Sequence, residues 1–468
     1  MRRHSFIVLV AGALAAAAVP PVLAQQQQQQ KEKPPAPGPA KNFVVPTAQH
    51  FTLPNGMQVT LVPYGQVPKV DVELVIYGGH ALEHADQVWL SDLMGDMMLE
   101  GTTTKTAAQV NDAVATMGGS LDLNTGADAT YIGADVLSDS GAALVALIAD
   151  VARHPRFPAS ELPRLKADRA RQLTIALSEP RNMATARFRA VLYPNHPYGR
   201  LFPTTQMLDG YTLEQIRAFY DSSFDAARAH LYVAGRFDST AMERAIRTAF
   251  GDWRAGTPIS LPVPKPVDVR SLHIIDRPGA VQSTIYMGLP VIDPSNPDWI
   301  ALQVTNALLG GSFASRITEN IREQKGYTYS PISIVSTRYR DAYWAEIADV
   351  TTNVTGASLK EIFGEIDRLR SNAPSVEELS GIQHYMSGIF ILQNSSRAAL
   401  VNQLEFVDLH GLGRQYLSDY VQRVFAVTPQ DVQRITQQDI DPQRMTIVVA
   451  GDRSKIDAQL APYGTGEP

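Results

Sequence analysis

The chain has 468 residues, 44% of them hydrophobic, no cysteine and a formal net charge of −6. Without cysteine no disulfide can hold the fold, so its stability must come from a buried core. The mild acidity argues against nucleic acid and anionic membrane surfaces as partners. The length predicts two or more domains.

Residues 1–24 have the pattern of a secretory signal, with Arg2 and Arg3 before an apolar run and Ala24 at a small-residue cleavage site. The apolar run is too short for a stable membrane span, so no span is expected after cleavage. We therefore expect an exported, periplasmic protein. Residues 25–47 are rich in glutamine and proline and are expected to form a disordered tether.

The folded part is predicted to begin at 51–63, where an Asn-Gly turn separates two alternating apolar runs, which favours a β-hairpin. Apolar periodicity then predicts further strands and helices in the first half. The strands are expected at 72–77, 120–125, 129–137 and 230–237, and the helices at 88–100, 105–117, 140–153, 159–176 and 239–250.

Residues 256–271 contain four prolines and no apolar period, which indicates a linker. The chain after it repeats the pattern before it. A strand at 285–290, a helix at 298–309, a strand and helix over 347–370 and a strand at 446–453 each match a segment of the first half. The sequence therefore predicts two homologous domains, 48–255 and 272–468.

One short motif has the residue types of a zinc site. His80, Glu83 and His84 form H-x-x-E-H, the inverted-zincin pattern. On a helix the two imidazoles would share one face and could hold Zn²⁺, and the glutamate could act as general base on a metal-bound water. Glu161 is the candidate third ligand. The alternative is that His80 and His84 are two exposed loop histidines.

The segment 74–102 ends in a predicted helix, and a second helix and a Gly-Gly-Ser follow it. This arrangement resembles the pitrilysin/insulinase, mitochondrial-processing-peptidase-like metallopeptidase family. Bacterial members carry H-F-L-E-H-M-L-F-K-G-T there. If the Gly-Thr pair that ends the segment sets the alignment, the first histidine falls on Asp92, the glutamate on Gly95 and the second histidine on Asp96. The third ligand, a glutamate, falls on Gln172. The resemblance then implies that this chain has no metal ligands and no cofactor of its own.

Asp92 and Asp96 leave a second possibility open. Two carboxylates on one helix face could hold a hard cation, with Gln172 as a third candidate ligand. The alternative is a solvated polar face.

Residues 308–330, LLGGSFASRITENIREQKGYTYS, resemble the same family over a longer and more specific stretch. The resemblance implies that Arg322 and Tyr329 form the family's Arg/Tyr pair, with Tyr327 as the less favoured tyrosine. There the arginine holds a substrate carbonyl and the tyrosine hydroxyl stabilises the oxyanion. The structural alternative is that Arg322 caps a helix end and Tyr329 lies in the core. His196, in H-P-Y-G, is expected to be a packing residue.

The resemblance implies an α+β fold of two homologous α/β-sandwich repeats. It also implies a zinc-less subunit that donates Arg322 and Tyr329 to a heterodimeric zinc endopeptidase acting on peptides, with zinc in a homologous partner chain. One alternative is a self-sufficient zinc endopeptidase using His80, Glu83, His84 and Glu161. The other is a non-enzymatic binding or scaffold protein of the same fold.

Overall fold

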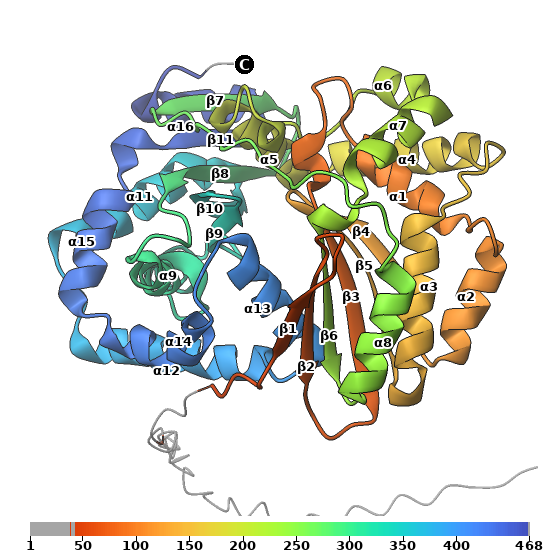
Figure 1. The fold of residues 1–468 in the computed structure, drawn as a ribbon. Coiled ribbons are helices and arrows are strands. Elements are labelled where there is room, and N and C mark those ends of the chain that lie inside the picture. The colour runs from red at the N-terminus through yellow and green to blue at the C-terminus, as the bar shows by residue number, and fades with distance from the viewer. Residues whose placement is uncertain (1–37, 39–42, 467–468) are drawn as a thin grey trace, which may run out of the picture. The chain divides into compact units, whose positions relative to one another are not determined.

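The computed structural model of the chain describes residue 38 and residues 43–466. The expected signal at 1–24 and most of the expected tether at 25–47 lie outside the described residues. Residues 43–466 belong to one compact unit, which contains a six-stranded and a five-stranded sheet, each flanked by helices (Figure 1). This confirms the α+β class.

The first sheet has the strand order β1-β2-β6-β3-β5-β4. The predicted hairpin at its edge is present, with Thr52 opposite Gln58 across the Asn55-Gly56 turn. Gly56 takes φ 93°, a conformation that favours glycine. The strands are β1 (Gln49–Thr52), β2 (Gln58–Pro63), β3 (Lys69–Tyr77), β4 (Asp122–Thr125), β5 (Ala129–Leu137) and β6 (Ala229–Gly235).

Strand β3 shows how the sequence builds this layer. Val70, Val72, Leu74 and Ile76 alternate along it and are fully buried in the N-terminal core. That core lies between the sheet and the helices of the first half, which run through α1 (Leu90–Leu99), α2 (Ala107–Thr116), α3 (Gly141–Arg153), α4 (Leu162–Ser178), α5 (Pro180–Leu192), α6 (Thr205–Gly210), α7 (Leu213–Ser223) and α8 (Ser239–Phe250).

The second sheet has the order β7-β11-β8-β10-β9. Its strands are β7 (Ser271–Asp276), β8 (Gln282–Val291), β9 (Ile332–Arg338), β10 (Asp341–Thr351) and β11 (Thr446–Gly451). The helices are α9 (Trp299–Asn306), α10 (Arg316–Thr318), α11 (Thr355–Ser371), α12 (Val376–Gln393), α13 (Arg397–Leu409), α14 (Gln415–Ala426), α15 (Pro429–Asp439) and α16 (Arg453–Leu460), with π-helical turns η5 (Ala307–Gly311) and η6 (Glu319–Gln324).

The two sheets repeat one topology. In chain order β2, β3, β4, β5 and β6 occupy the same positions as β7, β8, β9, β10 and β11, and β1 is an added edge strand. The parallel pair β2–β6 of the first sheet corresponds to the parallel pair β7–β11 of the second. The internal repeat read from the sequence is therefore a repeat of structure.

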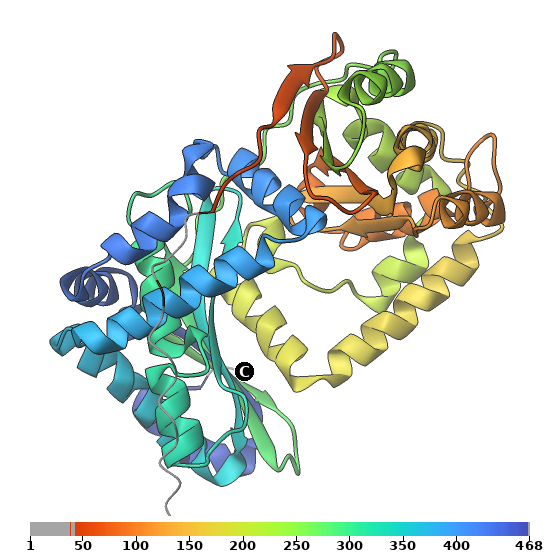
Figure 2. The ribbon, with the colours of Figure 1, turned by 90° about the horizontal axis from the view of Figure 1, so that it is seen from below.

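Each half contributes one helix to the sheet of the other half. α5 packs on β8 and β11, and α13 packs on β3 and β6. The side chains of α5 share a buried cluster with Tyr286 and Tyr343 of the second sheet. Figure 2 shows the long helix pair α4–α5 running from the first half to the second sheet. This exchange joins the halves across an apolar interface.

The predicted linker region lies between α8, which ends at Phe250, and β7, which begins at Ser271. It contains no helix or strand. None of the helices in the described part of the chain combines the length and apolar composition that a bilayer-spanning segment needs.

Candidate functional site

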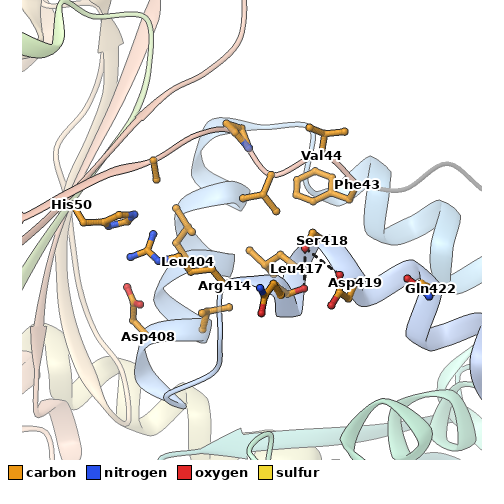
Figure 3. A pocket seen from close by; sticks show the side chains of 15 residues that line it. Phe43, Val44, His50, Leu404, Asp408, Arg414, Leu417, Ser418, Asp419 and Gln422 are labelled. Carbon is orange, nitrogen blue, oxygen red and sulfur yellow. Dashed lines mark hydrogen bonds between the residues drawn. The ribbon is translucent and has the colours of Figure 1, made fainter.

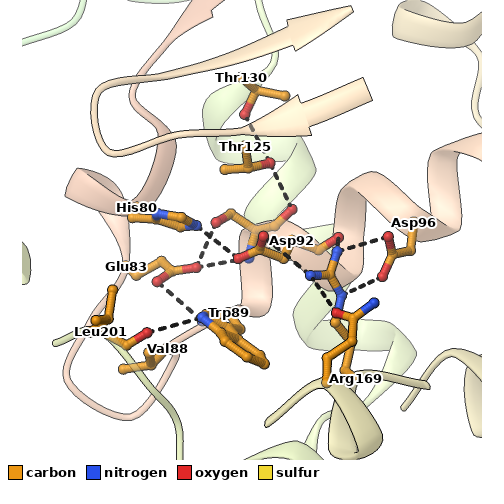
Figure 4. Close-up of polar contacts among 12 residues, drawn as sticks. His80, Glu83, Val88, Trp89, Asp92, Asp96, Thr125, Thr130, Arg169 and Leu201 are labelled. Carbon is orange, nitrogen blue, oxygen red and sulfur yellow. Dashed lines mark hydrogen bonds and ion pairs between the residues drawn. The ribbon is translucent and has the colours of Figure 1, made fainter. Parts of the chain in front are cut away.

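The aspartates of α1 lie against a cation from α4. Arg169 donates from Nε to Oδ2 of Asp96 at 2.6 Å and from Nη2 to Oδ1 of Asp96 at 2.8 Å. Its Nη1 lies 3.4 Å from Oδ1 of Asp92, and its Nη2 donates to the Asp92 carbonyl at 3.2 Å. Figure 4 shows the guanidinium between the two carboxylates.

Gln172 contacts the same guanidinium. Its Oε1 accepts from Nη1 of Arg169 at 3.3 Å. The three positions that the family resemblance aligns with metal ligands, Asp92, Asp96 and Gln172, therefore converge on one positive group. Asp92 is 15% exposed and Asp96 30% exposed, so the ion pairs are half-buried. Burial lowers the pKa of Arg169, but Asp96 and Asp92 outweigh it and the net shift is upward.

This arrangement does not fit a zinc ion. Zinc in proteins is held by imidazole, thiolate and carboxylate ligands, and these three positions offer no imidazole or thiolate. The guanidinium already pairs with both carboxylates and would repel a second cation placed between them. The expectation that Asp92 and Asp96 lie on a solvated polar face is wrong, because Arg169 pairs with both aspartates. Arg169 lies one turn before Gln172 on α4.

The H-x-x-E-H motif does not form one helical face. Only Gly79–Leu82 is helical, as a 3-10 turn, and Glu83 is extended with φ −73° and ψ 132°. His84 is exposed. Gly79 takes φ 47°, and a Cβ there would lie 2.2 Å from the Gly126 carbonyl oxygen, so the turn is pressed against the β4–β5 hairpin.

Glu83 has a structural task in this position. It is buried, and its carboxylate accepts from the Trp89 amide at 3.2 Å, the Ser91 amide at 3.0 Å and the Ser91 hydroxyl at 2.6 Å. These are free amides of the first turn of α1, where a carboxylate is stabilised by the helix dipole. The motif's glutamate therefore caps the helix that carries Asp92.

His80 is not an exposed loop histidine. Its Nε2 lies 2.7 Å from Oδ2 of Asp92, and its side chain is 30% exposed. Burial lowers the pKa of His80, but the hydrogen bond and charge of Asp92 outweigh it and the net shift is upward. His80, Glu83 and Asp92 bring ligand atoms within 4.8 Å of one another. These atoms already have partners. His80 bonds to Asp92, Glu83 accepts from amides of α1, and Asp92 also pairs with Arg169, so a metal ion does not fit among them.

Glu161 lies away from this cluster. It bonds to Arg164 at 3.0 Å, and Arg164 also pairs with Glu100 at the C-terminal end of α1. His80 contacts Asp92 near the N-terminal end of the same helix. The structure therefore does not bring His80, His84 and Glu161 together as one ligand set.

The predicted Arg/Tyr pair is brought together, with a third residue. The Arg322 guanidinium carbon lies 4.9 Å from the centre of the Tyr329 ring and 4.5 Å from the centre of the Phe313 ring. Tyr329 is 79% exposed and Phe313 is 68% exposed. Arg322 also pairs with the neighbouring Glu323 at 3.0 Å. Tyr329 is thus not a core residue.

The segment that carries this cluster, which includes α10 and η6, is fixed at several points. Arg316 binds Glu378 of α12 through two bonds of 2.7 and 2.8 Å. The Thr328 hydroxyl donates to the Asp349 carbonyl of β10 at 2.7 Å. Strand β9, which follows the loop, ends the second sheet. The cluster therefore lies at the start of an edge strand.

His196 is a packing residue, as the sequence indicated. It is buried, its Nδ1 accepts from the Tyr198 amide at 3.2 Å, and its Nε2 lies 3.1 Å from the Pro262 carbonyl oxygen. The last contact fastens the proline-rich linker to the first half.

Sequence reasoning missed Arg169 and Phe313. Arg169 could have been found by asking which cation lies one turn from Gln172 on a helix that faces two aspartates. Phe313 stands inside the Gly-Gly-Ser-Phe stretch of the second motif, and its apolar side chain after two glycines is the one signal in the sequence that could have indicated its role.

Two family profiles match the chain. The profile described as Insulinase (Peptidase family M16) matches residues 59–204, and that described as Peptidase M16 inactive domain matches residues 210–386. Together they cover more than half of the chain. An uncharacterized zinc protease from Mycobacterium bovis is 24% identical over 92% of this chain and 97% of its own length. Another from Streptomyces coelicolor is 20% identical over 86% and 90%.

Solved structures share the fold. The crystal structure of a peptidase M16 inactive domain from Pseudomonas fluorescens matches with a TM-score of 0.81 and 22% identity, over 90% of this chain and 100% of that chain. A protease from Helicobacter pylori matches with a TM-score of 0.82 and 19% identity, over 87% and 100%. The profile matches, the doubled sheet topology and the two motif regions together establish that the chain belongs to the pitrilysin/insulinase family of metallopeptidases, peptidase family M16.

Proposed function

We propose that this chain is the zinc-less subunit of an exported, heterodimeric M16 zinc endopeptidase. The observation that carries the proposal is the convergence of Asp92, Asp96 and Gln172 on the Arg169 guanidinium. A family member that has replaced its metal by an internal ion pair has no means of activating water there. Its partner, a homologous chain, would hold the zinc and the general base.

Arg322 and Tyr329 would be this chain's contribution to the reaction. Their side chains are stacked, and Tyr329 is 79% exposed while Arg322 is 24% exposed, so the tyrosine hydroxyl in particular could reach a substrate bound to another chain. A guanidinium offers a rigid fork of N–H donors for a peptide carbonyl. A phenol O–H would donate to the oxygen on which negative charge develops when water attacks that carbonyl.

Substrates would be peptides or unfolded segments bound in an extended form. An extended peptide can add a strand to an exposed sheet edge through backbone hydrogen bonds. Strand β9 pairs with β10 on one side, and its other edge has no partner strand within the described residues. Strand β4, the edge of the first sheet, packs along α1.

The test begins with the purified chain, residues 25–468, prepared without chelator. We expect no stoichiometric zinc and no peptide hydrolysis by this chain alone. Mixing it with a homologous chain from the same organism that carries a complete H-x-x-E-H ligand set should produce hydrolysis. Replacing Arg322→Ala or Tyr329→Phe should remove most of that activity.

Two outcomes contradict the proposal. Stoichiometric zinc that is lost in His80→Ala would make the chain a peptidase in its own right. A stable complex whose hydrolysis does not change in Arg322→Ala would instead favour a binding or scaffold role for the same fold.

A further inference from the structure

The contact between β3 of the first half and α13 of the second half contains several carboxyl groups. Successive side chains of a strand point to opposite faces of the sheet, so Asp71, Glu73 and Val75 share one face of β3. Val75 belongs to the same buried core as Leu404 of α13, whereas its neighbour Leu74 belongs to the N-terminal core. Asp71 and Glu73 therefore lie on the face of the sheet that α13 covers.

These carboxyl groups have no cation paired with them. Asp71 is 5% exposed, and neither Asp71 nor Glu73 has a hydrogen bond or an ion pair with a residue that the structure describes. Glu405 of α13 accepts a hydrogen bond from the Tyr131 hydroxyl at 3.2 Å. A Cβ at Gly133 would clash with the Glu73 carboxyl group, so the glycine leaves room for it. Asp71, Glu73 and Glu405 together form a carboxyl cluster.

The two basic side chains at this contact are bound to a different carboxylate. Lys69 donates to Oδ2 of Asp135 at 2.8 Å, and Arg397 of α13 donates to both oxygens of Asp135 at 3.0 Å. Burial raises the pKa of Asp135, but the hydrogen bonds from Arg397 and Lys69 outweigh it and the net shift is downward. This ion pair joins α13 to β5 and leaves the carboxyl cluster without a cation.

At the other end of α13 the carboxyl group of Asp408 has a cation nearby. Figure 3 shows Asp408 of α13 beside the guanidinium of Arg414, with His50 of β1 next to them. Asp408 accepts from the Tyr232 hydroxyl at 2.7 Å. Burial raises the pKa of Asp408, and the Tyr232 hydroxyl and the charge of Arg414 oppose this rise. The lack of a nearby free cation is therefore specific to the carboxyl cluster.

The other groups that face the carboxyl cluster are mostly acidic or neutral. The positive ones, Lys69 and Arg397, pair with Asp135. Burial lowers the pKa of His230 to about 3, so its ring is neutral near pH 7. The remaining groups are Tyr77 of β3, Asp122 of β4, Asp128 before β5, Tyr131 of β5, Tyr232 of β6 and Asp408 of α13.

The carboxyl cluster binds protons near neutral pH. Burial raises the pKa of Asp71 and of Glu405 to about 7 and that of Glu73 to about 8, above the ordinary values of 3.8 and 4.5. Neighbouring carboxyl groups add to each rise. As the pH rises, the cluster loses these protons, and the ionised carboxylates of β3 and α13 repel one another.

We propose that the carboxyl cluster makes the contact between the halves pH-sensitive: α13 stays on the first sheet while the cluster is protonated and leaves it when the cluster ionises. A protonated carboxyl group is neutral and can donate a hydrogen bond, whereas an ionised one only accepts. The packing of α5 on β8 and β11 still joins the halves when α13 leaves. The face of the first sheet then becomes accessible. This inference does not rest on the proposed function.

The direction of the effect follows from the protons that the cluster binds. The pKa values are raised only while α13 covers the cluster, so for Glu73 the covered state binds more protons between pH 4.5 and about 8. Raising the pH in this range favours the uncovered state, by about tenfold per pH unit for each proton released. Lowering the pH favours the covered state.

Two cysteine variants of the purified chain, residues 25–468, measure the contact, because the chain has no cysteine. Val75→Cys places a thiol under α13, and Leu74→Cys places one on the opposite face of the same strand, both at fully buried positions. Maleimide labelling rates are divided by those of the urea-unfolded chain at the same pH, which removes the effect of thiol ionisation. From about pH 6 to about pH 8, the corrected rate should rise about tenfold or more in Val75→Cys and stay the same in Leu74→Cys.

Hydrogen exchange of the unsubstituted chain gives a second measurement that needs no cysteine. The exchange rate of α13 amides, corrected for the intrinsic effect of pH, should rise over the same range. The amides of α3, which packs on β3 and β5 and belongs to the N-terminal core, should show no such rise.

Glutamine variants identify the groups responsible. Glutamine is neutral at every pH and similar in shape to glutamate, so Glu73→Gln and Glu405→Gln should each make the rise in the Val75→Cys labelling rate several-fold smaller. Glu214→Gln, a change of an exposed glutamate on α7, should leave the rise unchanged.

Each result decides the proposal. A rise confined to Val75→Cys and α13, and reduced by both glutamine variants, supports it. The proposal is overturned if neither the Val75→Cys labelling nor the α13 exchange rises with pH. It is also overturned if Leu74→Cys rises by the same factor, since the first half itself then unfolds, or if Glu73→Gln and Glu405→Gln both leave the rise unchanged.

Discussion

Arg169 and Asp96 form a two-pronged ion pair, with Nε–Oδ2 at 2.6 Å and Nη2–Oδ1 at 2.8 Å. The pair joins α4 to α1, at the positions that the family resemblance aligns with metal ligands. The same guanidinium reaches Asp92 and Gln172. The positive charge between these two helices therefore comes from the Arg169 side chain rather than from a metal ion.

The first prediction concerns this pair. Arg169→Ala removes the cation and leaves two half-buried carboxylates near each other, so the free energy of unfolding should fall by about 1–3 kcal/mol. Arg171→Ala is the matched control on the same helix, because Arg171 is 68% exposed and pairs with the exposed side of Asp168 rather than with the aspartates of α1. It should change the free energy by less than about 0.5 kcal/mol. Urea denaturation measures both, and equal effects would contradict the role given to Arg169.

A second prediction tests whether the guanidinium occupies the metal position. The triple change Asp92→His, Asp96→His and Gln172→Glu restores the ligand types that the family alignment assigns to these positions. With Arg169 retained, the charge repulsion should keep zinc affinity low. With Arg169→Ala added, the chain should bind one zinc, measured by equilibrium dialysis and metal analysis.

The contrast between these two variants is the informative result. If the triple variant binds zinc equally well with and without Arg169, the guanidinium does not compete with the metal. If neither variant binds while both remain folded by circular dichroism, the three positions do not form the ligand set that the alignment assigns to them.

The sequence predicted the elements of this site better than their contacts. The alternation in β3 and the apolar period of α1 placed both elements within a few residues of their observed bounds. The role of Asp92 and Asp96 was misjudged because their partner comes from α4, far away in the chain, and single-helix periodicity does not indicate which polar faces meet. His80 was misjudged for the same reason, since its partner is Asp92.

The exchange of α5 and α13 between the halves also could not be predicted from the sequence. An internal repeat predicts that two halves share one topology, but it does not say which half covers which sheet face. Phe188 of α5 lies against Tyr286 of β8 with ring centres 4.7 Å apart, a contact between halves. The apolar period of α5 would be the same if this helix packed on the sheet of the first half.

The third prediction separates the two aromatic neighbours of Arg322. In the reconstituted heterodimer, Phe313→Ala should reduce kcat/KM by several-fold, because Arg322 would lose one of the two rings that fix its guanidinium. Phe313→Tyr should keep the stack and most of the activity. Tyr329→Phe should keep the stack but lose the hydroxyl, with a larger loss of kcat.

Stability supplies the control for these changes. Phe313 and Tyr329 are mostly exposed, so neither substitution should shift the melting temperature by more than a degree or two, the size expected for surface changes. Tyr385→Ala, a change of another exposed aromatic in the second half, should leave kcat/KM unchanged. Similar losses of kcat/KM in Tyr385→Ala and Phe313→Ala would show that Phe313 has no specific role in holding Arg322.

The last prediction concerns Glu346, which lies on β10. Its side chain is fully buried, and neither carboxyl oxygen has a hydrogen-bond partner among the residues that the structure describes. A Cβ at Gly310 would lie 2.7 Å from its Oε2, so the glycine leaves room for the carboxyl group. Burial raises the pKa of Glu346 well above its ordinary value.

Because the folded pKa lies above the unfolded one, the folded state binds an extra proton between these two values, and stability falls as pH rises through this window. The free energy of unfolding should therefore decline as the pH rises above the ordinary glutamate pKa of 4.5, and Glu346→Gln, which is neutral at every pH, should make that decline smaller. Glu214→Gln, an exposed control on α7, should leave the decline unchanged. A decline of the same size in Glu346→Gln would mean that Glu346 does not lose its proton in this range, and that the pH dependence arises from other buried carboxyls such as Glu73, whose pKa burial raises to about 8.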